Sequence, residues 1–183
     1  MDAIRRHGDI EFIQVRHEES GAFAASAQAK LTGKLAVCVG TAGGGAIHLL
    51  NGLYDAKLDH APVLAITGQL PRCDMGNNSH QEINTPALFS DVTVFNQTLL
   101  AADCVPEIVQ QACNSALSEK GVAHIALPAD VAIEDVEADI TGHPIADTET
   151  ENTRPLVSAV NNALSLIQQA EKIVVLAGIG AIP

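Results

Sequence analysis

The sequence predicts an α/β fold, a mostly parallel sheet with helices on both faces. Short apolar runs bounded by turn residues recur along the chain, and stretches with apolar residues at helical spacing separate them. Strands that alternate with helices form parallel sheets, because a parallel connection needs a crossover. The chain has 183 residues, 47% of them hydrophobic, so it can bury the core of one ordinary domain with some residues left over.

The chain opens with a helix, a strand and a second helix. Residues 3–7 indicate the tail of a helix that Gly8 ends, and residues 11–15 indicate a short apolar strand. A helix rich in alanine is expected over 19–31, ending at Gly33. Many alanines on one helix favour close approach to a neighbouring backbone, which belongs either to the sheet or to another subunit.

Two buried strands and the helix between them follow. The apolar run over 35–40 is unbroken, which is typical of a strand buried on both faces. It leads into a glycine cluster and then a helix over 46–57. Residues 62–67 predict a second buried strand, which the turn residues 68–71 end.

A polar stretch separates these strands from the rest of the sheet. Residues 72–84 predict a long irregular loop, which is either a lid or substrate-facing segment or, more simply, surface decoration. The remaining elements are expected to be a short helix over 85–89, a strand over 92–95, a helix over 105–119 and a strand over 122–127.

The composition changes near the carboxyl end. Seven acidic residues between 134 and 151 favour a solvated linker, and the spacing of a calcium-binding loop is missing. A helix over 155–170 and a strand over 172–180 then indicate the start of a second domain. We therefore expect a first domain over 1–140, an acidic linker over 141–154 and the beginning of a truncated second domain over 155–183.

Charge and composition exclude several classes of partner. A net charge of −12 with only 10 Lys and Arg argues against binding to nucleic acid or anionic membranes. No apolar run reaches the roughly 20 residues of a membrane span, and the start lacks the hydrophobic stretch of a signal peptide, which favours a cytoplasmic location. The four cysteines show no C-x-x-C spacing, so neither zinc nor a disulfide framework is expected. Small molecules and other proteins remain as partners.

Two carboxylates mark the first candidate site. Glu18 and Glu19 stand between the strand over 11–15 and the helix that follows, at the carboxyl edge of the expected sheet. Open α/β folds bind ligands at this edge. Acidic residues are also common in a first helical turn simply because they offset the positive end of the helix dipole. The pair alone leaves both interpretations open.

A glycine cluster marks the second candidate site. Residues 40–45, Gly-Thr-Ala-Gly-Gly-Gly, join a strand to a helix, so that backbone N–H groups can face a ligand without side chains in the way. The cluster is neither a P-loop nor a dinucleotide fingerprint, because no Gly-Lys follows and Ala42 replaces the second glycine. A simple tight turn is the alternative. His48 and Asn51 share a face of the next helix, although a single helical histidine is a weak signal.

Several of these segments, taken in order, resemble the amino-terminal pyrimidine-binding domain of thiamine-diphosphate enzymes. Pyruvate oxidases and quinone-linked pyruvate dehydrogenases are most similar, and acetolactate synthases come next. The residues that carry the resemblance are 16–19, 40–45, 48–56, 62–68 and 81–82. The resemblance implies that residues 1–140 are this domain without its first strand and helix, and that 155–183 begin the family's central domain.

The resemblance also implies roles for individual residues. The family glutamate at the position of Glu18 shares a proton with ring nitrogen N1′ of the cofactor, so Glu18 is expected to be catalytic, in a water-poor pocket that raises its proton affinity. Glu19 would be polar support. The cofactor-binding residues would be Thr41, Gly43, Gly44, Gly45 and His48, and the substrate side would be formed by His80 and Gln81. No metal ligand is expected in this chain.

Cofactors and partners follow from the same resemblance. Thiamine diphosphate is expected, with Mg²⁺ bound through a missing carboxyl-terminal domain, so the chain alone is expected to be inactive. FAD and peripheral membrane association are left open for the full-length enzyme. The substrate would be a small 2-oxo acid, pyruvate first, and the site would be shared between subunits of a homodimer or homotetramer.

The chain departs from the family at two places, with Gly43-Gly44-Gly45 where Gly-Pro-Gly is common and His80 where phenylalanine is common. Two other functions remain open. One is a catalytically inactive α/β binding or interaction module. The other is a dinucleotide-binding domain, which is weaker because neither glycine turn is followed by a complete helix with the expected acidic residue.

Overall fold

The structure, a computed structural model, describes residues 2–136 and 155–178. Residue contacts divide the chain into two units, Met1–Thr148 and Glu149–Pro183. The linker predicted over 141–154 and the last residues of the predicted second domain lie outside the described residues.

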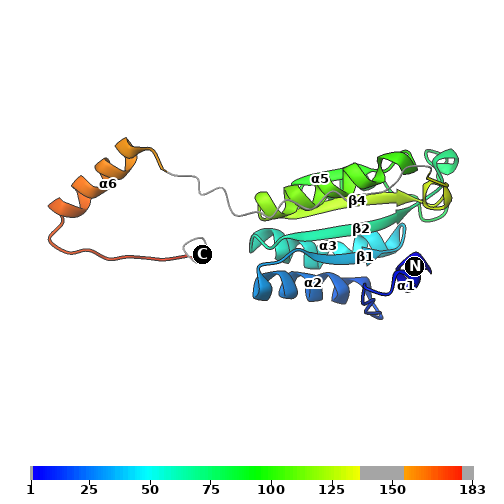
Figure 1. Cartoon of the computed structure of the whole chain (residues 1–183), viewed down its shortest axis with the longest axis horizontal. Helices are drawn as coiled ribbons and strands as arrows, with labels where there is room; N and C mark the ends of the chain where they lie inside the picture. Colours follow the sequence, from blue (N-terminus) through cyan, green and yellow to red (C-terminus); the bar gives the residue numbers. More distant parts are fainter. Residues whose placement is uncertain (1, 137–154, 179–183) are drawn as a thin grey trace. The chain divides into compact units, whose positions relative to one another are not determined.

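A parallel sheet of four strands forms the centre of the first unit (Figure 1). Its strands lie in the order β1-β2-β4-β3, and every neighbouring pair is parallel. Gly40 pairs with Thr67, which pairs with Ala126, so the strands end at a common edge. The strands are β1 Ala36–Gly40, β2 Val63–Gln69, β3 Phe95–Thr98 and β4 Val122–Pro128. The predicted α/β class is confirmed.

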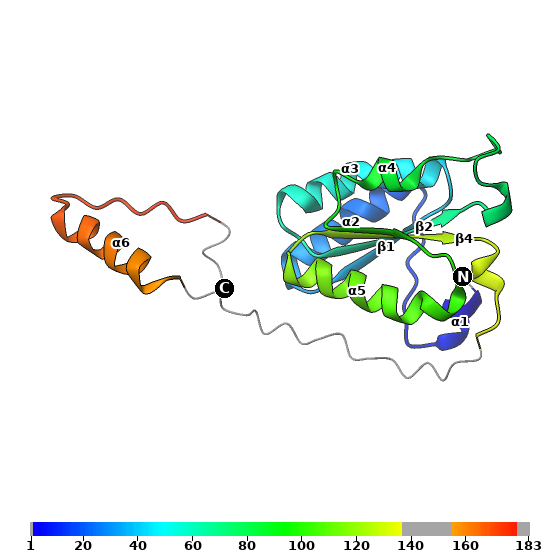
Figure 2. The ribbon, with the colours of Figure 1, turned by 90° about the horizontal axis from the view of Figure 1, so that it is seen from above.

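Helices cover both faces of this sheet. Figure 2 shows α2, α3 and α4 on one face and α5 on the other. The long helices are α2 Glu18–Thr32, α3 Gly44–Leu58 and α5 Val105–Ser118, and the shorter elements are α1 Asp2–His7, α4 Thr85–Phe89 and the 3₁₀ turns η1 Arg72–Asp74, η2 Ala102–Cys104 and η3 Val131–Ile133. All four helices predicted over 19–133 are present, and their ends agree with the prediction to within two residues.

The core has two apolar layers, one on each face of the sheet. In the layer between the sheet and helices α2 and α3, Leu49 and Leu53 of α3 and Val63 of β2 are completely buried. The layer between the sheet and α5 contains Ala116 of α5 and Ile125 of β4. Burial of such apolar surface is the main favourable contribution to folding.

The alanine-rich helix α2 approaches another backbone closely, as its composition predicts. A Cβ atom at Gly52 of α3 would lie 2.5 Å from the backbone nitrogen of Phe23 and 2.6 Å from the carbonyl carbon of Ala22. Ala25 and Ala29 are buried in the same layer. The neighbours of α2 are therefore the sheet and α3 of the same chain.

Two predicted strands are wrong. Residues 11–15 form no strand, and Ile10, Phe12 and Ile13 remain 55%, 50% and 74% exposed. Residues 173–178 form none either, while the end of that predicted strand lies outside the described range. An apolar run becomes a strand only where a neighbouring strand pairs with its N–H and C=O groups, and no strand that the structure describes pairs with these two runs.

The remaining strands differ from prediction in burial or in their ends. β1 is an edge strand whose Val37 and Val39 are 53% and 40% exposed, because α5 packs on the other three strands. β2 continues through Gly68 and Gln69, which pair with the end of β4. The strand predicted over 92–95 begins only at Phe95. Tertiary pairing, which the local pattern does not contain, sets each of these limits.

The second unit contains one helix, α6 Val157–Gln169, among its described residues. Val160, Leu164 and Ile167 repeat at helical spacing and are 47%, 48% and 50% exposed. This agrees with the helix predicted over 155–170.

Candidate functional site

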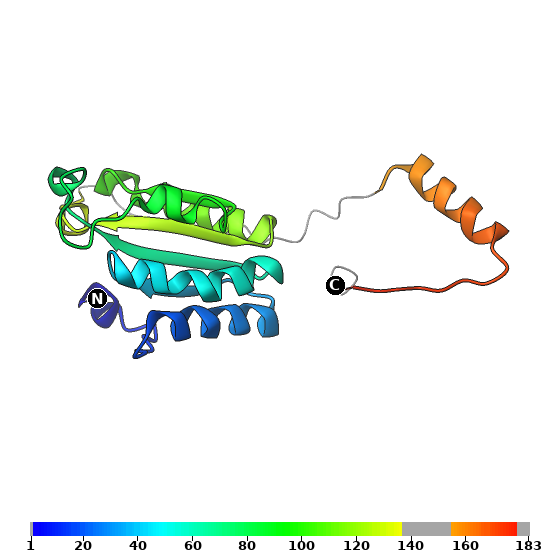
Figure 3. The same cartoon turned by 180° about the vertical axis from the view of Figure 1, so that it is seen from behind.

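The candidate residues gather at the carboxyl edge of the sheet, where β1 and β2 end and where α2 and α3 begin. Glu18 is the first residue of α2, and Gly44 is the first residue of α3. The loop that follows β2 projects from the same edge (Figure 3). The expected position of Glu18 is therefore right, although a helix start rather than a preceding strand places it there.

Glu18 lies directly against the glycine turn. A Cβ atom at Gly45 would stand 2.7 Å from Glu18 Oε1 and 2.6 Å from Thr41 Cγ2, so only glycine at this position leaves both side chains where they are. At Gly44, by contrast, a Cβ atom would meet nothing within 4 Å. At the start of α3, Gly45 therefore faces the Glu18 carboxylate, whereas the neighbouring Gly44 faces open space.

His48 is the polar partner of Glu18. Its Nδ1 lies 3.2 Å from Glu18 Oε2, and the Glu18 side chain is 29% exposed. The pKa of Glu18 is lowered, first by a hydrogen bond from its own backbone N–H and next by the hydrogen bond with His48. In this chain these hydrogen bonds outweigh the desolvation of the carboxyl group, so the raised proton affinity expected in a water-poor pocket stays a prediction.

A second set of contacts supports this pair. The His17 ring stacks on the His48 ring with centroids 4.3 Å apart, and His17 Nδ1 lies 3.7 Å from Glu19 Oε2. Glu19 also accepts a hydrogen bond from Asn51 Nδ2. The shared face of α3 thus binds the start of α2 at two points, and Glu19 is the polar support that the sequence predicts. His17 was missed, and its signal was its position directly before the carboxylates.

The loop after β2 closes onto the glycine turn through Gln81. Gln81 Nε2 donates to the carbonyl oxygen of Ala42 at 3.2 Å, and a Cβ atom at Gly43 would lie 2.8 Å from both Cβ and O of Gln81. Gly43 has a φ of +68°, which glycine adopts without strain. His80 is exposed and has no polar contact with any residue that the structure describes. Gln81, but not His80, is therefore brought to the turn.

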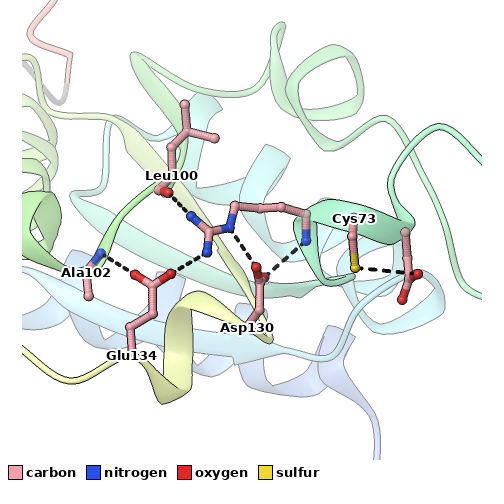
Figure 4. Close-up of polar contacts among 7 residues, drawn as sticks. Cys73, Leu100, Ala102, Asp130 and Glu134 are labelled. Carbon is pink, nitrogen blue, oxygen red and sulfur yellow. Dashed lines mark hydrogen bonds and ion pairs between the residues drawn. The ribbon is translucent and has the colours of Figure 1, made fainter.

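An arginine anchors the start of this loop (Figure 4). Arg72 donates from Nε and from its backbone N–H to the two carboxylate oxygens of Asp130, at 2.6 and 3.1 Å. Its guanidinium group also donates to the Leu100 carbonyl oxygen at 2.5 Å and to the Glu134 side chain, which in turn accepts from the Ala102 N–H at 3.1 Å. Sequence reasoning missed this cluster because it assigned Glu134 to the acidic linker.

A pocket of about 360 Å³ lies elsewhere, at the amino edge of the sheet. It is lined by the end of α3 at Lys57 and Leu58 and by the start of β4 at Val122. Because Glu18 lies at the opposite edge, this pocket is not part of the site. In the parts of the chain that are described, no group of His, Cys, Asp and Glu side chains could hold a metal ion, and no helix is long and apolar enough to cross a membrane.

The family model and the curated proteins that match this chain agree with the family that its sequence resembles. Residues 1–88 match the family model of the thiamine pyrophosphate enzyme, N-terminal TPP binding domain. YdaP of Bacillus subtilis is 43% identical over 171 residues, which are 93% of this chain and 30% of YdaP. Pyruvate oxidase of Lactiplantibacillus plantarum is 40% identical over 183 residues, 99% of this chain and 30% of that protein. Acetolactate synthase of Arthrospira platensis is 36% identical over 182 residues, 96% of this chain and 31% of that protein.

The chain thus spans about a third of the length of these curated relatives. The similarity extends past the matched 88 residues, because the aligned regions include nearly all of the chain.

Proposed function

This chain carries the N-terminal TPP binding domain of the thiamine pyrophosphate enzyme family. We propose that it supplies the aminopyrimidine-binding half of an active site that decarboxylates a small 2-oxo acid, with pyruvate as the main candidate substrate. The observation that carries the proposal is the Glu18 carboxylate beside the open face at Gly44. The 40% identity with a pyruvate oxidase supports this choice of substrate.

The residues at the carboxyl edge fit an aminopyrimidine ring. Glu18 offers carboxylate oxygens to a ring nitrogen that carries a proton, and a Cβ atom at Gly44 would meet nothing within 4 Å, which leaves open space beside the turn. Thr41, Gly43, Gly44 and Gly45 would hold the ring through the turn, and His48 would lie beside it. When bound, thiamine diphosphate supplies the nucleophilic carbon and stores the electron pair that decarboxylation releases.

Within this chain, Glu18 is the residue that would share a proton with the ring. Its lowered pKa keeps it ionised near neutral pH, which is the state that accepts a hydrogen bond from a ring N–H. His48 forms a hydrogen bond with Oε2 of Glu18, whereas Oε1 of Glu18 faces Gly45, so the two carboxylate oxygens have different neighbours. Covering the exposed side of Glu18 would exclude water and raise its proton affinity toward that of a ring nitrogen.

Other parts of the proposal concern the whole protein. We propose that Mg²⁺ and the diphosphate are bound by a further domain, that the site is shared between subunits of a homodimer or homotetramer, and that the protein is cytoplasmic, with FAD as an additional cofactor. The boundaries at residues 140 and 154 are proposed as the limits of the first domain and its linker. We also propose that Gln81 lies on the substrate side of the site. His80 is included because it is the neighbouring residue in the chain.

An acetolactate synthase-like function is the second candidate. The 36% identity with an acetolactate synthase covers nearly the same share of this chain as the match to pyruvate oxidase. The two candidates differ in product, so supplying pyruvate and measuring acetolactate separates them.

The role of Glu18 is tested in the full-length enzyme that contains this chain, assembled with pyruvate, Mg²⁺ and thiamine diphosphate. Glu18→Gln removes the negative charge at nearly constant shape and is expected to lower the decarboxylation rate by at least about 100-fold. Glu119→Gln, which changes an exposed carboxylate at the opposite edge of the sheet, is the matched control and should leave the rate unchanged. A Glu18→Gln enzyme within a few-fold of wild type would refute the assignment.

A further inference from the structure

The loop that carries Gln81 is organised around a neighbouring carboxylate, Glu82. The Glu82 side chain accepts hydrogen bonds from the backbone N–H groups of Gly76 and of Ser79, the latter at 2.9 Å. A carboxylate that receives several backbone N–H groups fixes the backbone around it, because these are charge-assisted hydrogen bonds. Residues 76–79 are therefore wrapped around the residue that directly follows Gln81.

The backbone at Gln81 needs such support. Gln81 has a φ of +65°, in the left-handed region that non-glycine residues seldom adopt. A conformation of this kind persists only where the surroundings determine it. The conformation presses Gln81 Cβ and O against Gly43 and directs the side-chain amide to the Ala42 carbonyl oxygen.

The two ends of the loop are held independently. At its start, Arg72 is bound to Asp130, Leu100 and Glu134. At its end, among the residues described, Glu82 is the only side chain that accepts hydrogen bonds from the backbone amides of residues 76–79. The hydrogen bonds from Gly76 and then Ser79 lower the pKa of Glu82, so the carboxylate stays charged at neutral pH.

We propose that Glu82 is a positioning residue, which holds Gln81 against the glycine turn without itself contacting the ligand. This inference rests on the proposed function for its consequence, namely that Gln81 faces the substrate bound beside Glu18. We call the hydrogen bonds from the backbone N–H groups of Gly76 and Ser79 to Glu82 the lock. The lock is a property of this chain and can be measured without any cofactor.

The first experiment measures backbone amide exchange by NMR in the full chain without cofactor. Glu82→Gln keeps the side-chain length but replaces one acceptor oxygen by an NH₂ group that faces a backbone N–H. Exchange at Gly76 and Ser79 is expected to accelerate about tenfold or more, because hydrogen bonds to a charged acceptor are stronger than those to a neutral one. Glu119→Gln is the matched control and should leave these rates unchanged. Equal exchange in Glu82→Gln and wild type would overturn the lock.

The second experiment is a double-mutant cycle in the full-length enzyme. Glu82→Gln is expected to lower kcat/KM for pyruvate about tenfold, but less than about twofold when Gln81→Ala is already present, because residues that act through one another are not additive. The same loss in both backgrounds would show that Glu82 does not act through Gln81. Glu82→Asp, which keeps the charge but shortens the reach, should recover part of the activity.

The two experiments separate the possible failures. Accelerated exchange with an enzyme that does not use thiamine diphosphate would sustain the lock and refute the proposed function. Unchanged exchange with an enzyme that needs Glu18 would sustain the proposed function and refute the lock.

Discussion

Two adjacent glycines at the start of α3 should respond differently to the same substitution. In Gly45→Ala the added methyl group would stand 2.7 Å from Glu18 Oε1, so the carboxylate must move by about 0.7 Å to reach the 3.4 Å of an ordinary contact. In Gly44→Ala the methyl group meets nothing within 4 Å. The pair therefore separates the displacement of Glu18 and of Thr41, whose Cγ2 would lie 2.6 Å from the new methyl group, from the general effect of replacing glycine by alanine on stability.

The expected magnitudes follow from these distances. Gly44 is the first residue of α3 and has no positive φ, so alanine there mainly restricts the unfolded chain, and Gly44→Ala should raise the free energy of unfolding by roughly 0.4–1 kcal/mol. Gly45→Ala has the same gain, and the atoms that it displaces, Glu18 Oε1 and Thr41 Cγ2, are ends of side chains that can rotate away. Its stability should stay within about 1 kcal/mol of wild type. A misplacement of about 1 Å near reacting groups costs about 100-fold in rate, so activity should fall about 10- to 100-fold.

Urea unfolding of the chain and pyruvate decarboxylation by the full-length enzyme are the two assays. The expected result is a Gly45→Ala variant that is stable but nearly inactive, and a Gly44→Ala variant that serves as the control for stability alone, because its methyl group points into the space proposed for the ring. If Gly45→Ala keeps an activity within a few-fold of wild type, the contact between Gly45 and Glu18 does not determine the site and the reasoning fails.

Two further predictions concern the core. His124 is completely buried between Thr67 and Asn96, 2.9 Å from Thr67 Oγ1 and 2.8 Å from Asn96 Oδ1, and burial lowers its pKa to about 4. Because the unfolded chain binds this proton near pH 6.5, the contribution of His124 to the free energy of unfolding is complete above pH 6.5 and declines by up to about 3 kcal/mol toward pH 4. Urea unfolding from pH 4 to 7 should show this slope in wild type, and a His124→Gln variant with the same slope would contradict it. Gly52→Ala should lower the free energy of unfolding by at least about 2 kcal/mol, since its methyl group would meet the backbone of α2 at 2.5 Å, and a loss as small as that of Gly44→Ala would disprove this tight packing.

Local patterns were sufficient for the helices. The short helix α4 occupies the predicted residues, and Asn84 caps it by accepting the Ala87 N–H at 3.1 Å. The alanines of α2 likewise predicted its close packing, which Gly52 allows. These features depend on neighbours within one or two helical turns, so the sequence carries them directly.

Strand limits depended on partners far away in the chain. Phe12 and Ile13 belong to the apolar run that predicts a strand but remain exposed without a pairing neighbour, whereas Gly68 and Gln69 look like a strand end and yet pair with β4. A strand is completed by hydrogen bonds to another segment, and no local pattern states whether that segment is present.

For the site, the sequence by itself, through its family resemblance, determined which residues are proposed: the carboxylate at Glu18, the glycines after β1, His48, His80 and Gln81. Only the tertiary structure decided how they meet. It placed Glu18 against Gly45, gave its carboxylate hydrogen bonds from its own backbone N–H and then from His48 that lower its pKa, and left His80 outside these contacts. The physical reason is that the proton affinity of a carboxyl group depends on the balance between its hydrogen bonds and its desolvation. For Glu18 that balance includes its own backbone N–H and a histidine 30 residues away in the chain, which only the folded structure brings to it.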